Sequence, residues 1–217
     1  MARTYYTDIR KMYVSYFARP ADVAGLQYWE GVIEANKGST AAVAAAFAQS
    51  TEYQSTYAGL DNAHVVNAVY QNLFGHAADA AGLDFWSKAL TSGAVTVANA
   101  VTTIGAGAQG TDLVALRDKV IAANAFTTEL DTPAEIAAYT GTAANQVGKA
   151  FLAQVIDDVS LLHAFDLDAL KTIFVTSLTT PATGSGGGAD HAAAVLHDDA
   201  AHVAIVGTPA VQVDHLA

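Results

Sequence analysis

One pattern constrains this chain more than any other: part of its first half is repeated 57 residues later. A single shift aligns aromatic, acidic, glycine and leucine positions in the same order in both copies. The aligned pairs are Tyr13 with Tyr70, Phe17 with Phe74, Asp22 with Asp79, Gly25 with Gly82, Leu26 with Leu83, Tyr28 with Phe85 and Trp29 with Trp86. Both tryptophans of the protein therefore hold one repeat position. Such self-similarity indicates one structural unit used twice.

Each copy is typical of two helices joined by a short turn. Apolar and aromatic residues recur at helical spacing over residues 9–17, and Pro20 marks the end of that helix. A second helix is expected over residues 22–36, with Gly38 as its stop. The second copy predicts the same pair, with Asp61 as the first cap.

The acidic and glycine positions of the repeat have a structural interpretation. Asp22 and Asp79 each follow a helix stop and precede a new helix, so their carboxylates are expected to cap it. Calcium binding is the alternative, but one carboxylate per turn is too few for six to eight oxygen ligands. Gly25 and Gly82 are expected where two helices approach closely.

The apolar positions predict the core of each helix pair. Trp29 and Trp86 follow Leu26 and Leu83 at a spacing of three, on one helical face. Burial is favoured over a role as sugar-binding platforms. Arg19 is expected to pair with a carboxylate, Asp22, or with a helix C-terminus, rather than with an anionic glycan.

The rest of the chain to about residue 180 also predicts helices. One opens at Thr111 or Asp112, and residues 132–135 form a capping box with proline at the first helical position. The fold class is therefore all-α: a helical bundle built on the duplicated pair. We divide the chain into the repeat region 1–110, further helices 111–180, a Gly/Ser-rich linker 181–190 and a tail 191–217.

The tail differs in character from the rest. It holds four histidines and no lysine or arginine, and residues 203–206 and 211–213 predict two short strands. Asp190, Asp198 and Asp199 are weak calcium candidates. The histidine and aspartate spacing matches no metal motif, so a solvated acidic tail is favoured over a metal site.

Composition excludes several function classes. The net charge is −11 and the pI about 4.7, which opposes binding to nucleic acid. The absence of cysteine removes disulfides and thiolate chemistry. No apolar stretch is long enough for a membrane span, and residues 1–6 lack the pattern of a signal peptide. Because no catalytic motif occurs, we expect no enzymatic activity and no cofactor except calcium.

The repeated motif resembles the bacterial family called domain of unknown function 4214. Tyr13–Trp29 follows that family's pattern Y-x-x-x-F-G-R-x-x-D-x-x-G-L-x-Y-W, with Ala18 in place of the glycine. Residues 73–86 keep most of it, with His76 in place of the arginine. The resemblance implies a secreted, S-layer-like or adhesin-like protein with an uncleaved C-terminal type I secretion signal. A similar motif occurs in phycobilisome linker proteins, which are scaffolds.

The expected function is therefore a structural one at the bacterial cell surface. The protein is expected to self-assemble into a lattice, filament or matrix, with calcium neutralising its acidic surfaces, and to use the type I export machinery. The alternative is an adhesin module for glycan or lipopolysaccharide. It predicts exposed aromatic residues grouped on one face, namely Tyr5, Tyr6, Tyr53 or Tyr57.

Overall fold

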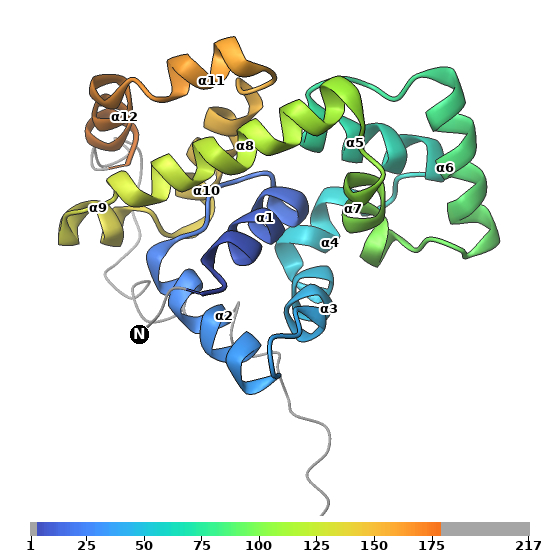
Figure 1. Cartoon of the computed structure of the whole chain (residues 1–217), viewed down its shortest axis with the longest axis horizontal. Coiled ribbons are helices and arrows are strands. Elements are labelled where there is room, and N and C mark those ends of the chain that lie inside the picture. Colours follow the sequence, from blue (N-terminus) through green and yellow to red (C-terminus); the bar gives the residue numbers. More distant parts are fainter. Residues whose placement is uncertain (1–3, 179–217) are drawn as a thin grey trace, which may run out of the picture. The chain divides into compact units, whose positions relative to one another are not determined.

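The structure, a computed structural model, describes residues 4–178, and these are helical with no strand (Figure 1). The all-α prediction is confirmed for this part of the chain. The described residues all fall within one unit. The predicted linker, the two predicted tail strands and the weak calcium candidates lie outside the described residues.

The first eight helices form two repeats of four, and each repeat opens with the predicted helix pair. The first repeat comprises α1 (Tyr6–Phe17), α2 (Val23–Ala35), α3 (Ala41–Gln49) and α4 (Thr51–Tyr57). The second repeat comprises α5 (Asn62–Phe74), α6 (Ala80–Ser92), α7 (Val97–Ala106) and α8 (Gly110–Glu129). The chain continues with α9 (Pro133–Ala138), α10 (Gly141–Ala153), α11 (Asp158–Ala164), α12 (Leu167–Ile173) and a π-helical turn, Phe174–Leu178.

Side-chain caps begin the second helix of each repeat. The Asp22 carboxylate accepts a hydrogen bond from the Gly25 N–H at 2.6 Å, and Asp79 accepts one from Gly82 at 2.7 Å. The Thr132–Glu135 capping box at α9 is also present. These contacts satisfy N–H groups that lack a partner inside their own helix.

The same two glycines lie at close helix contacts. The hydroxyl of Tyr13 occupies the space that a Cβ at Gly25 would need, and the Tyr70 hydroxyl lies 2.8 Å from the corresponding position at Gly82. Tyr13 and Tyr70 are themselves a repeat pair. Tyr13 of α1 and Tyr70 of α5 therefore each pack on the first turn of the following helix, and only glycine leaves room for them.

Aromatic rings fill the core of the first repeat. The ring of Phe47 in α3 lies 4.6–5.7 Å from four others, which belong to Tyr13, Tyr16, Phe17 and Trp29. A second group surrounds Phe126 of α8, with Tyr139, Phe151 and Phe174 at 4.9–5.1 Å.

Helix α8 connects these two parts of the core. It is the longest described helix, and it contacts α1 and α5 of the repeats as well as α10, α11 and α12 (Figure 1). The predicted boundary at residue 110 coincides with the start of α8. The helices on either side of that boundary share one continuous core.

The helix that precedes each turn ends in left-handed backbone. Ala18 has φ 52° and Gly75 has φ 83° at the same repeat position. A side chain in this conformation costs about 1–2 kcal/mol, whereas glycine adopts it freely. We therefore expect Ala18→Gly to raise the free energy of unfolding by about 0.5–1 kcal/mol, after the greater entropy of glycine in the unfolded chain is deducted.

The reverse substitution in the second repeat is the matched control. Gly75→Ala should lower the free energy of unfolding by about 1–2 kcal/mol, since a Cβ there would also lie 2.5 Å from Cγ2 of Ile156. Urea denaturation measures both variants. Two changes of the same sign would contradict this explanation.

Candidate functional site

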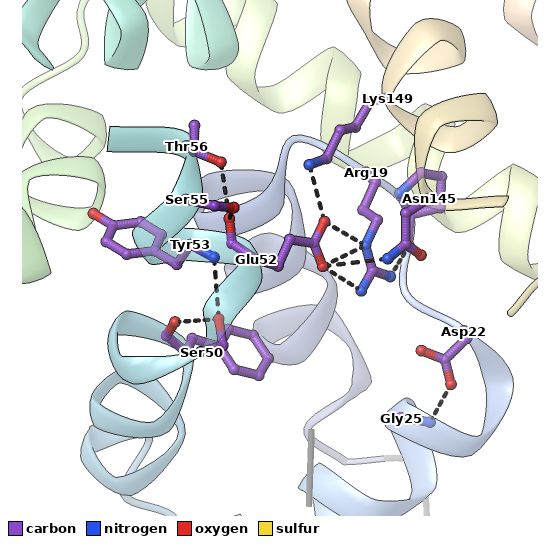
Figure 2. Close-up of polar contacts among 12 residues, drawn as sticks. Arg19, Asp22, Gly25, Ser50, Glu52, Tyr53, Ser55, Thr56, Asn145 and Lys149 are labelled. Carbon is purple, nitrogen blue, oxygen red and sulfur yellow. Dashed lines mark hydrogen bonds and ion pairs between the residues drawn. The ribbon is translucent and has the colours of Figure 1, made fainter. Parts of the chain in front are cut away.

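The polar residues of the first repeat gather where α1 turns into α2. Arg19 is only 3% exposed, and its Nη2 lies 2.9 Å from Oε2 of Glu52 on α4 (Figure 2). Its Nε donates to both carboxylate oxygens of Glu52, at 3.2 and 3.3 Å. The prediction that Arg19 pairs with a carboxylate is confirmed, but the partner is Glu52, because Asp22 is engaged as a cap.

Helix α10 covers this pair. Lys149 lies 3.0 Å from Oε1 of Glu52, and Asn145 donates to Oε2 at 3.4 Å (Figure 2). Burial by itself would lower the pKa of Arg19, but the charge of Glu52 and the hydrogen bonds to it raise that pKa overall. Burial would raise the pKa of Glu52, and the charge and hydrogen bonds of Arg19, with those of Lys149, lower it. Both side chains are therefore charged.

Two backbone carbonyls of the first turn also accept hydrogen bonds from distant helices. The Pro20 carbonyl accepts a hydrogen bond from the Tyr139 hydroxyl at 3.0 Å, and the Ala21 carbonyl accepts one from Thr127 at 2.7 Å. The Arg19 guanidinium lies 5.1 Å from the centre of the Tyr13 ring, in cation–π contact. The first turn is thus a buried anchor that joins α1, α4, α8 and α10.

The second repeat has a related but open arrangement. His76 replaces the arginine and is 51% exposed; its Nε2 lies 2.9 Å from Oδ1 of Asp112, in the first turn of α8. Its Nδ1 lies 2.8 Å from the Ala77 carbonyl oxygen. Each repeat therefore pairs the cationic position of its turn with a carboxylate on its fourth helix.

The prediction from sequence missed both carboxylates. Residues 49–52 read Gln-Ser-Thr-Glu and residues 109–112 read Gln-Gly-Thr-Asp, which aligns Glu52 with Asp112 at a shift of 60 rather than 57. An alignment that allowed three inserted residues before α8 would have identified them. Recurrence of an acidic residue at this position was the available signal.

The apolar positions of the two repeats differ in burial. Leu26 and Trp29 lie in the core, and Trp29 is 4% exposed, whereas no residue of α6 is fully buried. Leu83 and Trp86 are only partly buried, so the expectation of a core position holds for the first copy and not in full for the second. The neighbouring rings Tyr28 and Phe85 are 42% and 62% exposed.

A family model described as Domain of unknown function (DUF4214) matches the chain twice, at residues 4–57 and 44–106. Residues 4–106 belong to the DUF4214 family. The first match spans α1–α4 and the second α3–α7. Both capped turns, with their tyrosine–glycine contacts, lie within the matched residues. A search of curated proteins and a search of solved structures each gave no match.

In residues 4–178, no three histidine, aspartate or glutamate side chains lie close enough together to hold a metal ion. A cavity of about 160 Å³ between α10, α11 and α12 has Ser160 and His163 in its lining. The Ser160 hydroxyl donates to Asp157 at 2.7 Å, within the cap of α11. Among the same residues no helix is long and apolar enough to cross a membrane.

Proposed function

We propose that this protein is a non-enzymatic structural component that self-assembles or attaches at the bacterial cell surface, in an S-layer-like lattice, filament or matrix. The described polar motif residues support this. Asp22, Asp79 and Arg19 are all engaged in caps or ion pairs within the fold. Apolar faces left on the surface then remain as the groups available for contacts.

The incomplete burial of α6 carries the proposal. In the first repeat, α2 buries Leu26, Trp29 and Ile33, whereas α6 presents Leu83, Trp86 and Leu90 only partly covered. Phe85 extends this face, with its ring 4.8 Å from that of Trp86. A partly exposed apolar face gains free energy when it packs against another molecule. We assign it to contact with a second copy, in which many weak contacts would sum to a durable assembly.

Charge and export complete the proposal. The net charge of −11 makes copies repel one another, so calcium is proposed to promote assembly by neutralising acidic surfaces. Residues 191–217 are proposed as the type I secretion signal, which would place the protein outside the cell. These points rest on the charge and on the family resemblance.

One observation keeps the glycan-binding alternative in view. Tyr28 and Phe85 hold one repeat position and are both exposed, as a pair of stacking platforms for sugar rings would be. The prediction that Tyr53 and Tyr57 are exposed for this role was wrong, because both are buried in the core. A glycan site would therefore use the helix faces of α2 and α6.

Substitution of Phe85 tests the assembly proposal. The native chain is expected to form larger species at high concentration, more so in millimolar calcium, as measured by light scattering and sedimentation velocity. Phe85→Ser should move the onset of association to roughly tenfold higher concentration or more, since a buried phenylalanine contributes about 1.5–3 kcal/mol.

A matched variant controls for general loss of exposed apolar surface. Leu162 of α11 is also strongly exposed, and Leu162→Ser should assemble like the native chain. A native chain that stays monomeric in every condition would refute the proposal. Equal effects of the two substitutions would remove α6 as the interface.

A further inference from the structure

The hydrogen-bond partners of His76 favour its doubly protonated form. Nε2 faces a carboxylate oxygen of Asp112 at 2.9 Å, and Nδ1 faces the carbonyl oxygen of Ala77 at 2.8 Å. Both partners only accept hydrogen bonds. A neutral imidazole carries one N–H and would point a lone pair at one of these oxygens. The imidazolium, with two N–H groups, satisfies both.

The first repeat shows what this position does when its charge is permanent. Arg19 occupies the same place in the repeat, is buried and pairs with Glu52. Arginine stays protonated at any physiological pH, whereas histidine changes charge close to neutrality. Both turns therefore carry an ion pair when His76 is protonated, and only the first turn keeps its ion pair at higher pH.

We propose that the His76–Asp112 pair is a pH-responsive latch, which holds the turn before α6 against the start of α8 and loosens when His76 loses its proton. The Arg19–Glu52 pair is the permanent counterpart in the same chain. The latch acts within one molecule, so it does not depend on the proposed self-assembly.

The groups around His76 favour its charged form. Asp112 approaches from α8 and Asp79 from the start of α6, while Tyr70 and Phe74 of α5 place their rings 6.0 and 6.1 Å away. The hydrogen bond to Ala77 and then the one to Asp112 raise the pKa of His76 above its ordinary value of 6.5. The stabilising contribution of the pair is therefore complete below that value and is lost as the pH rises through the raised pKa.

Helix α6 is the element that the latch controls. It follows the turn directly, packs mainly on α5 and has no fully buried residue, so its outer face is open to solvent. The pair is half-exposed and screened by solvent, which limits its energy to that of a surface ion pair. Such an energy is too small to unfold the whole chain but is enough to change the local opening of a partly exposed helix.

NMR of the dilute, full-length chain tests the latch. Between about pH 5 and about pH 8, the His76 ring is expected to titrate with a midpoint above 6.5. Amide hydrogen exchange of α6, corrected for the intrinsic effect of pH, should become up to about fivefold faster over the same range. Exchange in α2 should change little.

Three variants make the result decisive. His76→Arg should abolish the pH response of α6, and His76→Gln should give fast exchange at every pH. His64→Gln is the control, since His64 is also exposed and paired with an aspartate, Asp61, but lies at the start of α5. In this variant, hydrogen exchange of α6 should depend on pH as it does in the native chain. A response retained in His76→Arg, or absent from the native chain, would overturn the proposal. Neither result depends on whether Phe85 mediates assembly.

Discussion

Arg19→Met is expected to lower the free energy of unfolding by about 3 kcal/mol or more. The substitution leaves Glu52 partly buried without its main counter-ion, and loss of one partner of a buried pair typically costs about 3–5 kcal/mol. Lys149 lies 3.0 Å from the same carboxylate and still neutralises part of its charge, so we expect a loss of stability near the lower end of this range. Urea denaturation with two-state analysis measures it.

Two comparisons separate the ion pair from simple loss of packing. The double variant Arg19→Met with Glu52→Gln should recover much of the stability, because no unpaired charge remains. His76→Met in the second repeat should cost less than about 1 kcal/mol, as exposed pairs do. Similar losses at Arg19 and His76 would show that burial does not distinguish the two turns.

Trp29→Ala is expected to cost about 3–5 kcal/mol, the range for deletion of a large buried ring. Trp29 is buried, and its ring meets that of Phe47 edge-on, 5.1 Å away. Trp86→Ala, at the same repeat position, should cost less than half as much because the ring is only partly covered. Urea denaturation of the monomeric chain measures both. Equal losses of stability would contradict the explanation that the burial of the two rings determines the cost.

Local signals made the helices and their turns predictable from the sequence. An aspartate that follows a helix stop caps the next helix through an N–H only three residues away, so Asp22 and Asp79 needed no knowledge of the rest of the fold. The close approach at Gly25 and Gly82 followed from the same local geometry. The family resemblance rests on these positions and was predictable with them.

Contacts between distant helices were not predictable in the same way. Glu52 lies 33 residues from Arg19 in the chain, and only the packing of α4 on the turn brings them together. The tryptophans show the same limit. Phe47 packs its ring on Trp29, whereas the residue 57 positions later is Ile104, which offers no ring to Trp86. Identical motif positions therefore differ in burial because their neighbours differ.

The length of α8 has a consequence for how the chain folds. Tandem repeats commonly behave as nearly independent units, each stabilised by its immediate neighbours. Here the fourth helix of the second repeat continues for 20 residues and packs on α1 of the first repeat and on α10, α11 and α12. A fragment that ends or begins near residue 110 would therefore expose part of the shared hydrophobic core. We therefore expect the duplicated halves to unfold as one cooperative unit, although the sequence contains two repeats.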